Sequence, residues 1–246
     1  MRKLLTVMVA LLFAASANAG LIELWDMNEG SGMTIDSSGS VGTQLTYHKA
    51  DPATPNWVAT PDGYGVDQPM RFVGQANGVW ENTISQFTVA AWVKLEGAGS
   101  TRHIFHGGDS NIIMGVDQWG RLTTDDHVTW APSNSVVGGS VPYGVWSFLV
   151  YTNTGSQATL YIDGVQVAQA ASTWSGALGD TWREITIGEN TTAGYYSFNG
   201  VIDEVALYDN ALDANAIGAL YAAGPVAAIP EPSLMVLLVG ALAMLR

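Results

Sequence analysis

The stretch that most constrains this chain is residues 195–223, which reads YYSFNGVIDEVALYDNALDANAIGALYAA. Asn199-Gly200 is a pair typical of tight turns, because both residue types tolerate positive φ. Residues 201–208 then alternate with the period of a β-strand, so that Val201, Asp203, Val205 and Leu207 are expected on one face. Asp203 is the carboxylate that interrupts this otherwise apolar face.

The same stretch predicts a helix after the strand. Asp213 is placed to cap a helix over residues 214–222, and Gly224-Pro225 ends it. Further strands are predicted upstream. Residues 87–95 alternate, and Trp92 makes the second face partly apolar too, as expected where two sheets stack and one of them is curved over a groove. Asp163-Gly164 predicts a two-residue hairpin turn.

Four segments in this order resemble one family: WDMNEGSGMTIDSSG (25–39), FTVAAWVK (87–94), WSFLVYTNTGSQATLYIDGVQV (146–167) and the closing stretch 195–223. Together they resemble a laminin-G-like, concanavalin A-type jelly roll. The resemblance implies an all-β sandwich of two antiparallel sheets with a short C-terminal helix. We expect it to occupy residues 20–224.

Composition is compatible with one β domain. The 246 residues are 48% hydrophobic and 13% charged, with 28 glycines for tight turns and no cysteine. A secreted form would therefore be stabilised without disulfides. The net charge of −13 disfavours nucleic acid and anionic lipid, which need clustered Lys or Arg.

The N-terminus predicts export. Residues 1–19 combine Arg2 and Lys3, an apolar run and a small-x-small end at Ala17-Asn18-Ala19, so we interpret them as a signal peptide cleaved between Ala19 and Gly20. The alternative, a membrane anchor, needs about 20 apolar residues, and this run is shorter. Removing two of nine basic residues leaves seven against 22 acidic ones, a formal charge of −15.

The C-terminus carries Pro230-Glu231-Pro232, an apolar run over 234–245 and Arg246, after a linker at 225–229. Residues 230–246 resemble the PEP-CTERM sorting tail of Gram-negative bacteria. The resemblance implies an exosortase-type sorting enzyme as partner, transient inner-membrane anchoring through the tail, and release to the cell surface or extracellular matrix. The apolar run is shorter than a full span, and one Arg stands where the family has a basic cluster.

No catalytic motif is recognised, so we expect no enzyme activity. Laminarinase-type glycosidases of this fold use E-x-D-x-x-E or E-x-D-x-E, which brings two carboxylates close together. Neither spacing occurs: Glu184 lies five residues before Glu189 with Gly188 between them, and the adjacent Asp203 and Glu204 should point to opposite faces of a strand. His103 and His106, three apart in a strand-like segment, should also point to opposite faces, as solvated histidines.

Calcium is a candidate cofactor. Hard cations take carboxylate, amide and carbonyl oxygens. Asp203 is the first candidate ligand, because a carboxylate in an apolar face must be paired or metal-bound. Asn28, Glu29 and Gly30 are the expected neighbours, since the first and last strands should lie side by side. The equal alternative is that Asp203 accepts hydrogen bonds from backbone amides of that turn.

Aromatic residues in loops suggest carbohydrate, because sugars stack their C–H faces on such rings. The candidates are Trp130, Trp174, Trp182, Tyr195 and Tyr196. The sequence therefore favours a secreted or surface-sorted, non-catalytic binding module for polysaccharide or other matrix glycans. The alternatives are an adhesion protein that binds other surface proteins and a divergent glycoside hydrolase.

Overall fold

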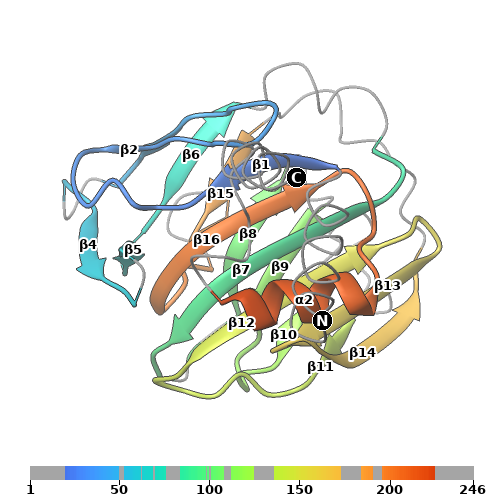
Figure 1. Cartoon of the computed structure of the whole chain (residues 1–246). Helices are drawn as coiled ribbons and strands as arrows, with labels where there is room; N and C mark the ends of the chain where they lie inside the picture. The colour runs from blue at the N-terminus through green and yellow to red at the C-terminus, as the bar shows by residue number, and fades with distance from the viewer. Residues whose placement is uncertain are drawn as a thin grey trace, which may run out of the picture.

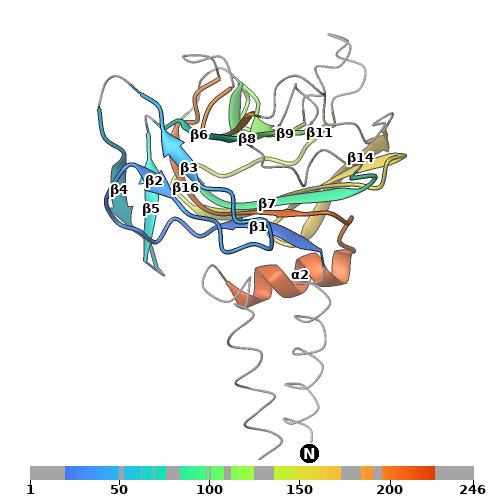
Figure 2. The same ribbon diagram turned by 90° about the horizontal axis from the view of Figure 1, so that it is seen from above.

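The computed structural model describes residues 20–49, 53–61, 63–68, 70–75, 84–97, 99, 101–107, 112–124, 136–172, 184–190 and 196–224. Within them, two antiparallel sheets are stacked as two layers, and one helix lies beneath one of the layers (Figures 1 and 2). This is a concanavalin A-like jelly roll, as the sequence predicts.

Sheet A is the layer next to the helix. Its strand order is β14 (Val165–Ala171), β13 (Gln157–Ile162), β12 (Trp146–Asn153), β7 (Phe87–Leu95), β16 (Gly200–Tyr208), β5 (Tyr64–Asp67) and β4 (Asn56–Ala59), with β1 (Leu21–Trp25) also paired to β16. The predicted contact between the first and last strands is confirmed, because Trp25 lies opposite Val205.

Sheet B is the second layer. Its order is β11 (Val137–Gly138), β10 (Leu122–Thr123), β9 (Ile112–Val116), β8 (Arg102–Gly107), β15 (Glu184–Ile187), β6 (Phe72–Gln75), β3 (Leu45–Tyr47) and β2 (Thr34–Ile35).

The main core fills the space between the sheets. Large side chains such as Trp25, Phe72, Phe87 and Phe105 are fully buried there. Fully burying one such side chain is worth about 1.5–3 kcal/mol. Strand β7 behaves as its alternation predicts. Its odd-numbered residues Phe87 to Leu95 enter this core, while Ala90 and Trp92 face the helix side.

Helix α2 (Ala214–Ala223) covers the outer face of sheet A. Asp213 caps it as predicted, with Oδ1 accepting from the Ala216 amide at 2.8 Å. Ile217 and Leu220 are buried, and Tyr221 stacks on Trp92 with ring centroids 5.9 Å apart. Helix α2 is too short to cross a membrane, and no other helix in the described ranges is long and apolar enough to do so.

A β-bulge in β16 overturns the predicted face of Asp203. Asp203 lies opposite Trp92 and Ala206 opposite Ala90, so Glu204 and Val205 together oppose one residue. Glu204 lies at this bulge and has a positive φ of 48°. Val205 consequently enters the main core, whereas Asp203 shares the helix-side face with Trp92. The expectation that Asp203 and Val205 share one face was wrong, because simple alternation does not survive a bulge.

Candidate ligand-binding surfaces

Of the aromatic residues predicted to bind sugar, Tyr196 lies within the described ranges, whereas Trp130, Trp174, Trp182 and Tyr195 lie outside them. Tyr196 is half-buried with φ of 57°. Its ring stacks on His103 at a centroid distance of 4.8 Å, and its carbonyl accepts from the His103 amide at 2.8 Å. One face of this ring is therefore already occupied by a histidine.

His103 and His106 lie on the same face, contrary to expectation. The pairing of β8 with β9 shifts between His103 and Phe105, so a bulge turns both histidines away from the core. Their ring centroids are 5.5 Å apart, and the side chains are buried rather than solvated. This pair marks the outer face of sheet B, the surface opposite α2.

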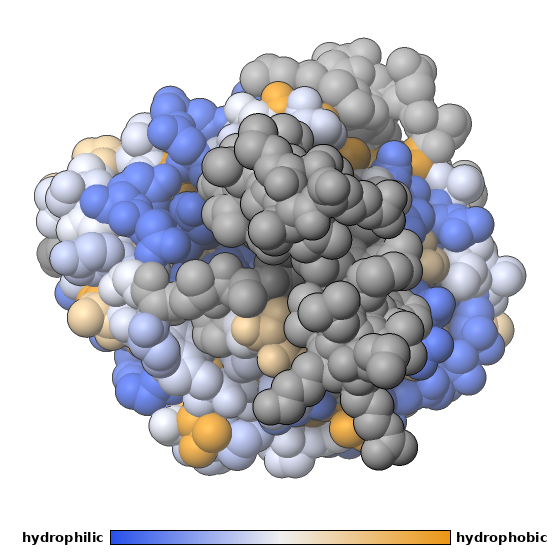
Figure 3. All heavy atoms as spheres, in the orientation of Figure 1, coloured by the Kyte–Doolittle hydropathy of each residue, from blue (hydrophilic) through white to orange (hydrophobic). Residues whose placement is uncertain are grey.

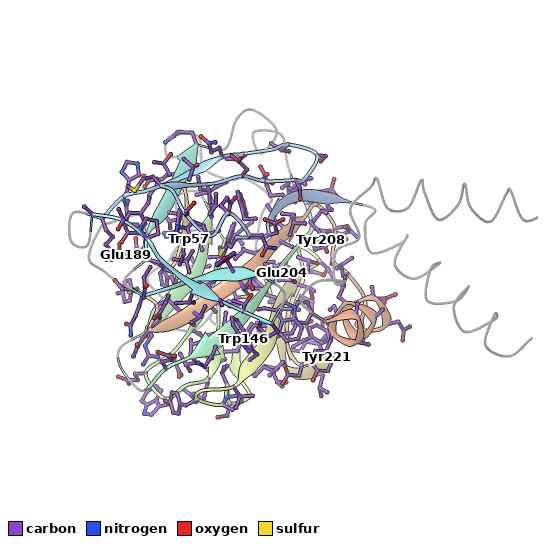
Figure 4. All side chains as sticks on the ribbon, turned by 60° about the vertical axis from the view of Figure 1, so that its left-hand side comes forward. Trp57, Trp146, Glu189, Glu204, Tyr208 and Tyr221 are labelled. Carbon is purple, nitrogen blue, oxygen red and sulfur yellow. The ribbon has the colours of Figure 1, made fainter. Side chains whose placement is uncertain are left out.

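A buried charge cluster lies beside this face. Glu189 is fully buried and accepts from Lys49 Nζ at 2.8 Å and from Ser197 Oγ at 2.5 Å. Arg71 binds Glu184 at 2.8 Å and lies 3.6 Å from Glu189. Figure 4 shows Glu189 far from Tyr221 on α2. Both glutamates thus belong to one ion-pair network, which holds the end of β15 in position.

Three of the four predicted calcium ligands, Asp203, Asn28 and Glu29, accept a hydrogen bond from a backbone amide. Asp203 is buried, and its Oδ1 accepts from the Glu204 amide at 2.9 Å. Asn28 Oδ1 accepts from the Tyr64 amide at 3.0 Å.

Glu29 lies in the same turn as Asn28. Its Oε1 accepts from the Asp36 amide at 2.9 Å. Partial desolvation raises the pKa of Glu29, and that hydrogen bond from Asp36 opposes the rise. Among the described residues, no group of three or more His, Asp or Glu side chains is arranged to hold a metal ion. A calcium ion would therefore need backbone carbonyls as well.

Trp119 is an exposed aromatic residue that the sequence analysis missed. Strand β10 contains only Leu122 and Thr123, and Trp119 lies in the turn that precedes it. Its side chain is 66% exposed, the largest exposure among the large hydrophobic residues described. The available signal was the turn sequence Asp117 to Gly120, which places the tryptophan outside any strand.

The turn that carries Trp119 is tightly held. Asp117 Oδ1 accepts from the amides of Trp119 and Arg121, each at 2.9 Å. Asp117 Oδ2 accepts from Arg121 Nε at 2.8 Å. The Arg121 guanidinium carbon in turn lies 4.8 Å from the centre of the Trp119 ring, which is cation–π geometry. The indole is therefore exposed and yet fixed in orientation.

Residues 141–143 lie against this turn. The Val141 amide donates to the Gly120 carbonyl at 2.8 Å. A Cβ atom built onto Gly120 would lie 3.2 Å from Tyr143 Oη, so Tyr143 packs closely against the turn. Tyr143 is 48% exposed. We call Trp119, Arg121 and Tyr143 the Trp119 platform.

The family model for the concanavalin A-like lectin/glucanases superfamily, Laminin_G_3, matches residues 73–218. The match spans more than half of the chain, so this protein belongs to that family. No curated protein matches the chain.

Solved structures with the same fold are distant in sequence. Domain 4 of the extracellular GH43 arabinanase of Geobacillus stearothermophilus, solved with arabinotriose, is 20% identical with a TM-score of 0.60, and the match covers 81% of this chain and 97% of that domain. The binding domain of Paraclostridial Mosquitocidal Protein 1 is 14% identical with a TM-score of 0.65, covering 83% and 52%.

Trypanosoma rangeli sialidase, solved with 2,3-difluorosialic acid, is 16% identical with a TM-score of 0.60, covering 82% of this chain and 33% of the sialidase. The chain thus spans about a third of the sialidase, and about half of the mosquitocidal-protein chain and of a botulinum neurotoxin type C chain that it also matches. At these identities the similarity shows the fold alone.

Proposed function

We propose that this protein is an exported, non-catalytic module that binds glycans through the Trp119 platform. The observation that carries the proposal is the exposed indole of Trp119, which lies against the Arg121 guanidinium in a turn whose backbone is held by Asp117. A flat pyranose C–H face would stack on the free side of that ring. Because the ring is already ordered, binding loses little side-chain entropy.

The polar groups around the platform favour a sugar over an apolar ligand. Arg121 is 45% exposed along its side chain, and Tyr143 carries a hydroxyl. Both can donate to sugar hydroxyl oxygens at the rim of a stacked ring. Arabinotriose is bound in the structure of one relative, and the cell entry of botulinum neurotoxin type C, another relative, depends on two ganglioside molecules. These observations support a glycan as the ligand class.

The absence of catalysis belongs to this proposal. It is supported by the lack of a paired-carboxylate motif in the sequence and by the ion pairs that hold Glu184 and Glu189. Export at Ala19/Gly20, sorting through the Pro230–Pro232 motif by an exosortase-type enzyme, and a final place at the cell surface or in the matrix are further parts of it. Export, sorting and this final location rest on the amino-acid sequences of the N-terminal and C-terminal segments.

The test is a glycan array probed with the wild-type chain and with Trp119→Ala. We expect the wild-type chain to bind neutral polysaccharides or polysaccharides that combine neutral and charged sugars. Trp119→Ala should weaken this binding at least tenfold. Tyr64→Ala is the matched control, since Tyr64 is a 44% exposed aromatic on β5 in the other sheet. Reducing-end assays on the bound glycans should show no turnover. Equal binding by the wild type and Trp119→Ala would show that the glycan site lies elsewhere on the molecule. Binding to surface proteins but to no glycan would favour the adhesion alternative.

A further inference from the structure

The Trp119 platform contains an arginine whose charge is already balanced. Arg121 Nε and Nη2 lie 2.8 and 2.7 Å from one carboxylate oxygen, Asp117 Oδ2. Asp117 is buried, so water competes little for this carboxylate. Its other oxygen, Oδ1, accepts from two backbone amides of the turn. The exposed indole therefore lies beside a paired cation and not beside a free one.

The N–H groups that Arg121 leaves unused suit a sugar hydroxyl. A guanidinium has five N–H donors. Nη1 makes no hydrogen bond with the described part of the chain, and the side chain is 45% exposed. A hydroxyl oxygen can accept from Nη1 without bringing a charge. A carboxylate that bound the same atom would lie close to Asp117, and the two anions would repel each other.

The charged residues next to Tyr143 are also balanced. Tyr143 forms a β-bridge with Leu95 of β7. Lys94 and Glu96, on either side of Leu95, pair with each other at 3.4 Å. This ion pair adds no net charge at the hydroxyl of Tyr143.

Arg102 is a further cation at this end of the sandwich, but it is enclosed. It pairs with Val116, close to the start of the turn that carries Trp119. Its side chain is fully buried, and its Nη1 donates to the Gly97 carbonyl at 2.9 Å. Gly99 covers the guanidinium, since a Cβ built onto it would lie 2.7 Å from Nη2. Arg102 therefore presents no N–H group to a sugar on the platform.

We propose that Asp117 sets the charge preference of the Trp119 platform, so that a neutral sugar binds there better than a carboxylated one. This inference rests on the proposed function and names the class of sugar. A neutral sugar keeps both the stacking on Trp119 and the hydrogen bonds of Arg121. A carboxylated sugar adds repulsion from Asp117, and the net charge of −13 acts in the same direction over a longer range.

The face that carries α2 provides little competition for a neutral glycan. Over the coloured part of that face, hydrophobic residues appear as isolated spots on a largely hydrophilic to neutral surface (Figure 3). This part of the surface offers no broad apolar patch on which a neutral polysaccharide could bind instead.

The test compares the binding of the full chain to two forms of the same polysaccharide. The probes are galactomannan and a β-glucan, each beside the form in which C6 hydroxyls have been oxidised to carboxylates. The wild type should bind each neutral form about fivefold or more tightly than the oxidised form. Asp117→Asn keeps an acceptor for the turn amides and leaves the Arg121 cation unbalanced. It should shift the ratio of affinities by about fivefold or more toward the oxidised form.

Two further variants show that the effect is local and electrostatic. Arg121→Gln leaves the Asp117 carboxylate without its cation and should shift the ratio toward the neutral form. Asp209→Asn changes the net charge as Asp117→Asn does and should leave the ratio unchanged. Asp209 is exposed at the end of β16, where Tyr208 pairs with Thr88, at the opposite end of β7 from the bridge to Tyr143. Added salt should reduce the shifts in ratio, because it screens exposed charges.

The outcomes separate this inference from the proposed function. Binding that Trp119→Ala leaves unchanged, or no binding to any probe, contradicts the proposed function and this inference with it. Binding that depends on Trp119 but is equally strong for the neutral and oxidised forms overturns this inference alone. The same holds if Asp117→Asn and Asp209→Asn, both folded by circular dichroism, give the same ratio. If Asp117→Asn does not fold, a ratio for Arg121→Gln that equals that of the wild type overturns it.

Discussion

Tyr208 is the residue whose ionisation is most affected by the fold. It lies at the end of β16, fully buried, and its hydroxyl has no hydrogen-bond partner in the described part of the chain. Burial, and secondarily the charge of Glu204 on the same strand, raises its pKa strongly above the ordinary value (Figure 4). The folded protein therefore keeps this phenol neutral at a pH where the unfolded chain ionises it.

This raised pKa predicts alkaline destabilisation. Below about pH 10, the ordinary tyrosine pKa, the phenol is neutral in both states and the stability contribution is fully present. Above it, the unfolded chain loses a proton that the folded one retains, so the unfolding free energy falls by about 1.4 kcal/mol per pH unit from this group. Tyr208→Phe should flatten the fall in urea midpoint between pH 10 and 11 and cost little at pH 7. If the urea midpoint of the mutant falls as steeply with pH as that of the wild type, other groups cause the alkaline destabilisation.

Asp203 carries the calcium prediction. A buried carboxylate is costly unless it is paired, and a Ca²⁺ ion shared with the Asn28–Gly30 turn would offset that cost. At 100 times its dissociation constant, a ligand specific for the folded state adds about 2.7 kcal/mol. That corresponds to a rise of roughly 5–10 °C in melting temperature for a domain of this size.

Chelation with EDTA should accordingly lower the melting temperature, and Asp203→Asn should remove the response. Asp109→Asn, a change in the acidic sequence Asp109-Ser110-Asn111 that the calcium prediction does not use, should retain it. If EDTA has no effect and Asp203→Ala still unfolds the domain, the carboxylate acts only as an acceptor for backbone amides such as that of Glu204.

Local patterns predicted the strands and the helix well wherever the backbone is regular. The alternation in β7, the cap at Asp213 and the pairing of β1 with β16 are all confirmed. The bulges in β8 and β16 were not predictable, because the residues that shift register have no distinctive composition. Their effect on the sites is large, since they bring His103 beside His106 and turn Asp203 toward Trp92. The Trp119 platform was missed because exposure depends on tertiary packing.

Helix α2 offers a test of its predicted cap. Asp213→Ala removes the acceptor for the Ala216 amide and should destabilise the domain by about 1 kcal/mol, within a range of 0.5–2. The melting temperature should fall by about 2–4 °C. Asp213→Asn is the matched control, because asparagine caps helices equally well. Equal losses in both variants would show that the charge, and not the cap, is what stabilises this helix.

For the whole chain, the prediction concerns processing. Protein released by the producing cells should begin at Gly20 and lack the residues after about Pro232, because apolar runs at both ends of the sequence have no place in the sandwich. Intact-mass spectrometry of the released protein tests this. Released protein that retains its C-terminus through Arg246 would count against sorting by an exosortase-type enzyme.

The pairing of β1 with β16 has a practical consequence for handling this protein. The Gly20 carbonyl accepts from the Asp209 amide at 2.8 Å, and α2 follows on the same side of sheet A. The first described residue and the end of α2 therefore both belong to the sheet A layer, away from sheet B (Figure 2). A tether or affinity tag joined at either position would orient the molecule alike on a biosensor chip, leaving sheet B and the Trp119 turn facing the flowing solution.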